Sequence, residues 1–178
     1  GAAIHWFGAR MRDPAPLPLH FSPSGAQRGS QAIVTEKCRI GARIPVADGA
    51  DMDALGSAIH ACLALSFTDR GVPLTEDDVH RLLEGFAVAE SLAAAAVLRQ
   101  IEAFHAWLEA RWPGARAHAE IPVQQRLENG QLLNGRIDLL LETDAGWVLI
   151  DHKSSQRAPD HWEVLATEHA PQLSCYAA

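Results

Sequence analysis

Two apolar stretches that each carry an aspartate decide the fold of this chain: GRIDLLL at residues 135–141 and VLIDHK at residues 148–153. In a β-strand, alternate side chains face the same side of the sheet. The apolar residues at alternate positions of the first stretch therefore share one face, and Asp138 points to the other. In the second stretch, Asp151 and Lys153 share a face, away from the apolar residues that alternate with them. The pattern predicts two neighbouring strands, each with one apolar and one polar face.

The turn Thr143-Asp144-Ala145-Gly146 sets the register of these strands. If the loop consists of Asp144-Ala145, then Asp138 lies directly opposite Asp151, and the apolar residues of both strands form one face. Two opposed carboxylates repel each other, so a cation between them is expected. A three-residue loop with Gly146 in a bulge shifts the register by one and stays an alternative.

Asp138, Asp151 and Lys153 together form the arrangement that a metal-assisted phosphodiesterase needs. Mg²⁺ is bound in proteins by one or two carboxylates together with substrate phosphate and water. A lysine beside a metal-bound phosphate orients or deprotonates the attacking water, or offsets developing charge. The alternative is a surface hairpin with an ordinary Asp–Lys pair. The apolar run before Asp151 and the second aspartate on the neighbouring strand favour the metal site.

Helices are expected on both sides of these strands. Apolar periodicity and capping signals predict helices over residues 53–67, 75–86, 90–111, 160–169 and 171–178, and strands over 117–127, 132–142 and 147–153. Asp51 or Asp53 is expected to cap the first helix, and Thr75 the second. The Asn129-Gly130 pair predicts a hairpin between the first two strands. The predicted fold class is α/β or α+β, with a small sheet and a helical N-terminal part.

Composition predicts one domain with an attached arm. The chain has 178 residues, of which 48% are hydrophobic, which suits a single core. Prolines and glycines are dense over residues 13–31, so residues 1–50 are predicted to form a partly extended linker or arm, with disorder as the alternative. Residues 51–178 are predicted to form the domain. No apolar run is long enough to span a membrane.

The cysteines and the net charge limit the function classes. The three scattered cysteines predict no disulfide framework and no CxxC metal site, so a cytoplasmic location is expected. The net charge of −7 argues against binding nucleic acid by bulk electrostatics, because phosphate contacts need Lys and Arg. A nuclease site tolerates this charge, since divalent ions neutralise clustered carboxylates and a partner domain can deliver DNA.

Four motifs in order resemble a known family. GRID at residues 135–138, IDHKS at residues 150–154 and Gln172-Leu173-x-x-Tyr176 resemble the signature of the PD-(D/E)XK nucleases. LGSAIH at residues 55–60 is similar to the family's helix that carries a metal-binding histidine. The resemblance spans residues 53–178 and is greatest to the C-terminal nuclease domains of RecB and AddA. It implies a restriction-endonuclease-like core: a small mixed sheet with a β-meander, flanked by helices.

The resemblance also implies residue roles. It assigns the metal ligands and the catalytic lysine by position: His60, Asp138, Asp151 and the backbone carbonyl of His152 hold the metal, and Lys153 is the catalytic lysine. Gln172 and Tyr176 are expected to support the site or to contact DNA, with simple anchoring of the last helix as the alternative. Without the resemblance, His60 is interpreted as a packed core residue. Glu120 is interpreted as facing solvent, with membership of the acidic site as the alternative.

The function that the resemblance implies is a Mg²⁺-dependent DNA exonuclease domain, with Mn²⁺ as a substitute. Such a domain belongs to an ATP-dependent helicase–nuclease that acts in double-strand-break repair and recombination near the bacterial nucleoid. Its expected partners are DNA, the helicase domains of the same parent chain and a second subunit. No GxxxxGK[ST] motif is present, so the helicase motor is expected elsewhere in that chain.

Two departures from the family and one alternative function accompany this expectation. Some relatives hold an iron–sulfur cluster with four cysteines, which three cysteines cannot do. The chain stops at the helix that carries Tyr176, where the family fold normally continues, so a truncated C-terminus is expected. The alternative function is a catalytically silent, nuclease-like module that binds DNA or a partner. A small structural metal-binding domain is a second alternative.

Overall fold

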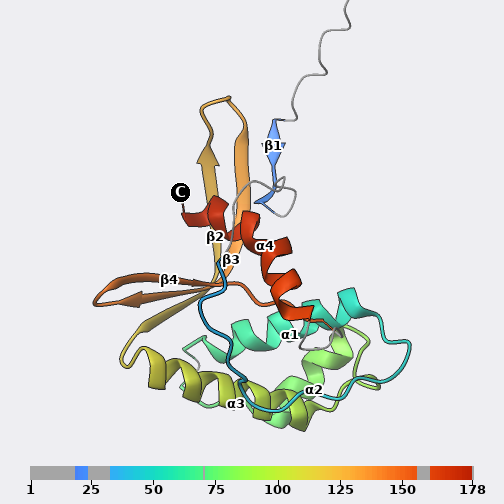
Figure 1. The fold of residues 1–178 in the computed structure, drawn as a ribbon. Coiled ribbons are helices and arrows are strands. Elements are labelled where there is room, and N and C mark those ends of the chain that lie inside the picture. The colour runs from blue at the N-terminus through green and yellow to red at the C-terminus, as the bar shows by residue number, and fades with distance from the viewer. Residues whose placement is uncertain (1–18, 24–32, 70, 156–160, 178) are drawn as a thin grey trace, which may run out of the picture.

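The three helices between residues 52 and 111 gather at one end of the structure, and a long β-ribbon projects from them (Figure 1). The computed structural model describes residues 19–23, 33–69, 71–155 and 161–177. These residues form, in chain order, β1 (His20–Phe21), α1 (Met52–Ser66), α2 (Glu76–Gly85), α3 (Ala94–Arg111), β2 (Arg116–Arg126), β3 (Leu132–Thr143), β4 (Gly146–Ile150) and α4 (Trp162–Ala177). The predicted mixed α/β class, with a small sheet flanked by helices, is confirmed. None of the helices described here combines the length and the apolar character that a membrane crossing requires.

Helices α1, α2 and α3 pack around one apolar core. The buried members of this core come from all three helices and from the turn before α3: Leu55, Ala58, Cys62, Val79, Leu83, Val88, Leu92, Val97 and Ile101. The predicted caps are present. The Asp51 carboxylate accepts hydrogen bonds from N–H groups of the first turn of α1, and Thr75 forms a capping box with Asp78 at α2. The core and the caps together fix the position of α1.

The third helix begins at Ala94, later than predicted. Val88 and Leu92 in the preceding turn are 3% and 2% exposed, because they point into the helical core. The carbonyl of Ser91 accepts a hydrogen bond from the N–H of Ala47. The turn before α3 is therefore held by tertiary contacts, which override the helix propensity of its sequence.

The last helix, α4, is one helix where two were predicted, over residues 160–169 and 171–178. Residue 160 and residue 178 lie outside the described residues. Pro171 lies inside α4, where a proline removes one backbone hydrogen bond and costs about 3 kcal/mol. Both Ala170 and Pro171 are buried, so packing of this turn offsets the cost.

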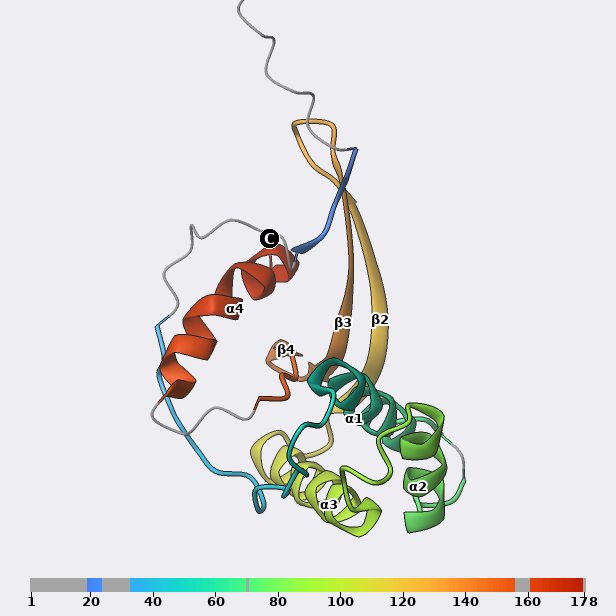
Figure 2. The same cartoon turned by 90° about the vertical axis from the view of Figure 1, so that its right-hand side faces the viewer.

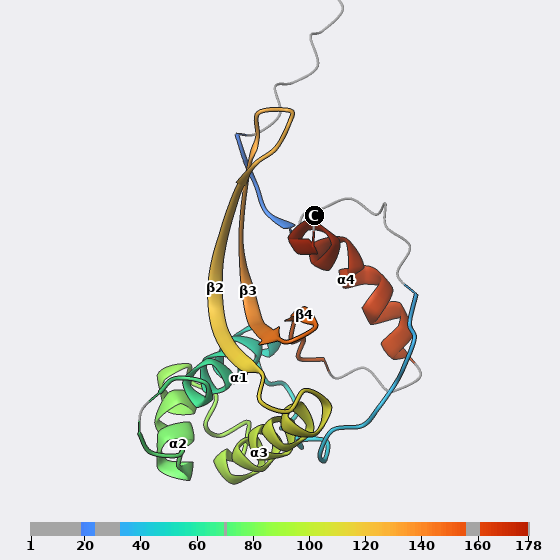
Figure 3. The ribbon, with the colours of Figure 1, turned by 90° about the vertical axis from the view of Figure 1, so that its left-hand side faces the viewer.

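Every other strand pairs with β3. Strand β2 pairs with it antiparallel along almost its whole length, across a turn in which Gly130 has a φ of 84°. On the other edge of β3, β1 pairs parallel at residues 132–133 and β4 pairs antiparallel at residues 139–143. The two residues of β1 are too few to give a periodic pattern, so the sequence does not predict this strand. Figures 2 and 3 show the ribbon of β2 and β3 rising from the helices, with α4 beside it.

The register of β3 and β4 follows the two-residue loop. Thr143 pairs with Gly146, and Leu139 pairs with Ile150, so the Asp144-Ala145 loop is confirmed and the three-residue alternative is wrong. The apolar faces of the two strands pack together with Leu108 of α3, as part of a second core cluster.

Strand β4 ends at Ile150, earlier than the predicted residue 153. Beyond this point the backbone N–H of His152 donates to the Asp138 side chain instead of continuing the ladder. The ladder therefore stops one pair short of Asp138 and Asp151.

The predicted arm, residues 1–50, lies partly outside the described residues, as does most of its proline-rich part, residues 13–31. Residues 33–50 form neither helix nor strand. Ile44, Val46 and Ala50 nevertheless pack against the helical core. The boundary at residue 50 stays a prediction.

Shortening a core side chain on α1 tests this packing. Leu55 is 2% exposed, so Leu55→Ala is expected to lower the free energy of unfolding by about 2–5 kcal/mol, through lost burial and a residual cavity. The control is Val72, which is 62% exposed; Val72→Ala should change the free energy by less than about 0.5 kcal/mol. Urea unfolding followed by circular dichroism measures both, and equal small effects would contradict the described core.

Candidate metal centre

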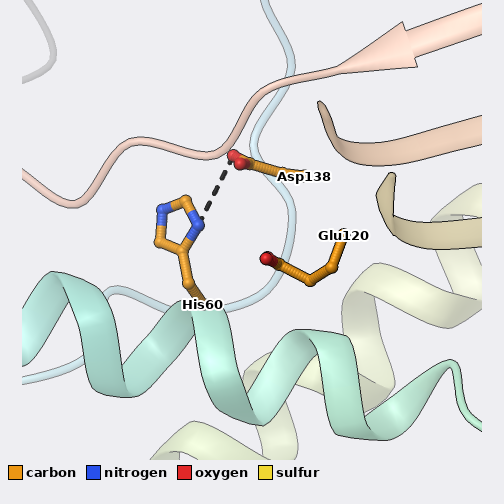
Figure 4. Close-up of side chains that lie close together, drawn as sticks. All are labelled: His60, Glu120 and Asp138. Atoms are coloured by element: carbon orange, nitrogen blue, oxygen red, sulfur yellow. Dashed lines mark ion pairs between the residues drawn. The ribbon is translucent and has the colours of Figure 1, made fainter. Parts of the chain in front are cut away.

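Three side chains from three different elements converge at the base of the ribbon. Figure 4 shows His60 of α1, Glu120 of β2 and Asp138 of β3 close together, with Asp138 facing the imidazole of His60. One ligand atom of each residue lies within 4.8 Å of the ligand atoms of the other two. His60 Nδ1 is 3.5 Å from Asp138 Oδ2. We call these three residues the HED cluster.

The β2–β3 register places Glu120 across from Asp138. The neighbouring pair, Ile121 and Ile137, follows this register, but the strand pairing is interrupted at Glu120 itself. Glu120 has a φ of 55°, a left-handed conformation that costs a non-glycine residue roughly 1–3 kcal/mol. Side chains opposite one another on paired strands are close, and like charges there are destabilising. The fold thus accepts both backbone strain and carboxylate repulsion at one point.

Positive groups and hydrogen-bond donors offset part of this repulsion. Arg136 Nη1 lies 2.8 Å from Glu120 Oε2. On the other side, the backbone N–H of His152 donates to Asp138 Oδ2 at 2.7 Å. Each carboxylate therefore has a partner of its own, and the imidazole of His60 lies near both.

His60 and Asp138 shift each other's pKa. The hydrogen bond to Asp138, together with the negative charge of this carboxylate, outweighs burial and raises the pKa of His60 above 6.5. Burial alone would raise the pKa of Asp138. Hydrogen bonds from His60 and from the His152 backbone, with the positive charges of His60 and Lys153, instead lower the pKa of Asp138. The pair is thus arranged to keep the carboxylate ionised.

His152 is a half-buried, neutral neighbour of this pair. Burial, followed by the positive charge of His60, lowers the pKa of His152 to about 4. Its ring meets the His60 ring edge to face, with ring centroids 5.1 Å apart. The structure shows its backbone N–H contacting Asp138, whereas the metal-binding role of its carbonyl stays a prediction.

Asp151 and Lys153 form a second polar group with Gln172. Lys153 Nζ lies 2.6 Å from Asp151 Oδ2, and Gln172 Nε2 donates to Asp151 Oδ1 at 3.0 Å. Only 6% of the Asp151 side chain is exposed. Over the part of the chain that is described, Asp151 is not a member of the HED cluster. The structure therefore brings the predicted site residues together as two adjoining groups, and the role of Asp151 as a ligand stays a prediction.

The alternative that Glu120 belongs to the acidic site is the one that the structure supports, because its carboxylate lies within the HED cluster while 32% of its side chain is exposed. The sequence contains a signal that identifies it. A three-residue loop over Glu128-Asn129-Gly130, closed by the hydrogen bond from Leu127 N–H to the Gln131 carbonyl, fixes the register that puts Glu120 opposite Asp138.

A groove of about 870 Å³ adjoins the Asp151–Lys153 group. Residues 38–46, α1, α3 and residues 150–155 line it. Among its lining side chains, Arg39, Arg43 and Lys153 carry positive charge. The groove gives a large molecule a way to approach Lys153, whose side chain is 33% exposed.

The electrostatics of the centre can be measured in metal-free protein. The imidazole of His60 is expected to titrate above 6.5, because the Asp138 carboxylate stabilises its protonated form. In Asp138→Asn the pKa of His60 should fall, since burial then dominates. NMR titration of the histidine ring signals measures both values. A His60 pKa that does not fall in this variant would contradict the described pair.

Comparison with known proteins was made on the whole chain. A family model described as the PD-(D/E)XK nuclease superfamily matches residues 35–178, which is more than half of the chain. A search of curated proteins found no significant match. The matched residues include the HED cluster and the Asp151–Lys153 group. The chain belongs to the PD-(D/E)XK nuclease superfamily.

Proposed function

We propose that this chain is a divalent-metal-dependent nuclease that hydrolyses DNA phosphodiesters. The observation that carries the proposal is the HED cluster, in which an imidazole and two carboxylates converge in a member of a nuclease superfamily. The strained φ of Glu120 adds support, because backbone strain of this kind concentrates at functional sites.

The donor set of the HED cluster fits a hard divalent cation. Carboxylate oxygens suit Mg²⁺ and Mn²⁺, and imidazole is a common additional ligand. His60, Glu120 and Asp138 line a cavity of about 20 Å³, which is room for one water-sized ligand. A bound cation would polarise the scissile phosphate and lower the pKa of a bound water. Asp151 and the backbone carbonyl of His152 are proposed as further ligands, since their segment contacts Asp138 through the His152 N–H.

Lys153 is proposed as the catalytic lysine. Its ammonium group lies at the groove, beside Asp151, where an incoming phosphate would meet a positive charge. In that position Lys153 would orient the attacking water and offset the negative charge that develops on the phosphate. Asp151 and Gln172 hold the ammonium group in place, because Gln172 hydrogen-bonds the carboxylate that pairs with it.

A finer proposal concerns the biological setting. We propose that the chain is the exonuclease domain of a RecB/AddA-like helicase–nuclease that acts in double-strand-break repair and recombination in the bacterial cytoplasm. The order of the four motifs supports it, from LGSAIH at residues 55–60 to Gln172 and Tyr176. The net charge of −7 is compatible with this setting, since helicase domains or a second subunit would deliver the DNA.

The net charge favours a second candidate function. A nuclease-like module that has lost catalysis would bind a partner protein without needing an excess of Lys and Arg. Activity measurements separate the two candidates.

Substitution of the proposed catalytic residues tests the nuclease. Asp138→Asn and Lys153→Ala are each expected to reduce the cutting of linear DNA in Mg²⁺ or Mn²⁺ by about 100-fold or more, because each removes charge stabilisation at the reacting phosphate. Gel assays of initial rates, with chelator-treated protein as the metal-free reference, measure the loss.

Matched controls lie on α2, away from the HED cluster. Asp77 and Arg81 are exposed there. Variants Asp77→Asn and Arg81→Ala should cut linear DNA at the same rate as the unmodified chain. Full activity in Asp138→Asn or Lys153→Ala would show that the assigned site is wrong. An unmodified chain that is folded yet cuts no DNA with either metal would favour the silent module.

A further inference from the structure

The Tyr176 side chain hydrogen-bonds backbone groups at one edge of β3. Strands β1 and β4 cover the two ends of this edge, at residues 132–133 and 139–143. Between them, the Tyr176 hydroxyl accepts a hydrogen bond from the Arg136 N–H at 3.2 Å and donates one to the Arg136 carbonyl at 2.9 Å. Tyr176 thus satisfies the two backbone groups that a neighbouring strand would otherwise pair with.

Gly135 makes this contact sterically possible. A Cβ atom at Gly135 would lie 2.6 Å from Tyr176 Cε1 and 2.7 Å from the Tyr176 hydroxyl oxygen. It would also lie 3.0 Å from Cγ of Pro23. Both Tyr176 distances are shorter than real Cβ contacts, so any residue other than glycine must displace the ring. The requirement at Gly135 comes from close packing.

Helix α4 also contacts the Asp151–Lys153 group. Gln172 precedes Tyr176 by one turn of α4 and lies on the same helical face. Its amide donates to Asp151, which pairs with Lys153. The position of α4 on β3 therefore determines where the Gln172 amide lies.

We infer that Gly135 and Tyr176 are positioning residues that seat α4 against β3, so that Gln172 holds Asp151 and Lys153 in place. Three roles are expected for Tyr176: support of the site, contact with DNA, or anchoring of the last helix. The hydroxyl bonds the Arg136 backbone through both its donor and its acceptor, which favours anchoring of α4, and through α4 support of the site, over contact with DNA. Only the kinetic test of this inference, the change in kcat, rests on the proposed nuclease activity.

The test starts from four single-residue variants of the full chain. Tyr176→Phe keeps the ring and removes both hydrogen bonds, Gly135→Ala displaces the ring, and Gln172→Ala breaks the link to Asp151. The control is Gly85→Ala, because a Cβ atom at Gly85 would meet no atom within 4 Å. Circular dichroism and Tm first establish that each variant is folded.

The decisive readout is the side-chain nitrogen NMR signal of Lys153 in protein with labelled lysine. The chain has lysines at positions 37 and 153, so Lys37→Arg assigns the signal. Gly135→Ala, Tyr176→Phe and Gln172→Ala are each expected to shift the Lys153 signal and to lower kcat by about 10–100-fold. In the double variant, adding Tyr176→Phe to Gln172→Ala should change neither the Lys153 signal nor kcat further. Both substitutions act through the hydrogen bond between Gln172 and Asp151.

Two results distinguish the possible failures. If Tyr176→Phe and Gly135→Ala leave the Lys153 signal at its unmodified position, or if Gly85→Ala shifts it equally, the inference is overturned. If the unmodified chain cuts no DNA but the Lys153 signal shifts as expected, the proposed activity fails and the positioning role stands. Should Gly135→Ala fail to fold, Tyr176→Phe alone decides the outcome.

Discussion

The structure depends on one electrostatic constraint: two carboxylates, those of Glu120 and Asp138, lie opposite each other on paired strands. Two like charges about 4 Å apart repel by about 4 kcal/mol at an effective dielectric constant of about 20. The Arg136 guanidinium, the His152 N–H and the His60 imidazole offset part of this repulsion. A cation among the three ligand groups would offset the remainder, and this is the physical reason to regard the cluster as a metal centre.

The elements around the cluster hold its members at fixed positions. Strand β3 carries Asp138 and pairs with every other strand, so any shift of β3 would move the whole site. Helix α1 carries His60 and is held by its Asp51 cap and the helical core. Helix α4 lies against β3 at the edge between β1 and β4, and it brings Gln172 to Asp151. Residues far apart in the chain thus meet at one place, because the other strands and α4 all contact β3.

Local signals predicted much of this arrangement, and tertiary contacts decided the rest. The alternating apolar residues and the Asp144-Ala145 loop were enough to fix the β3–β4 register. Glu120 belongs to the HED cluster because β2 pairs with β3 across the Asn129-Gly130 turn. The periodicity of apolar residues alone does not specify this pairing. The continuity of α4 through Pro171 likewise depends on burial against other elements, whereas the sequence shows only a residue that breaks helices.

The most direct test of the metal centre is a crystal structure of the chain grown with Mn²⁺, with anomalous scattering used to locate the ion. We expect one anomalous peak bonded to His60, Glu120 and Asp138, at ligand distances of about 2.0–2.3 Å. An ordered site in which Mn²⁺ binds elsewhere, with the Glu120 and Asp138 carboxylates turned away from each other, would contradict it.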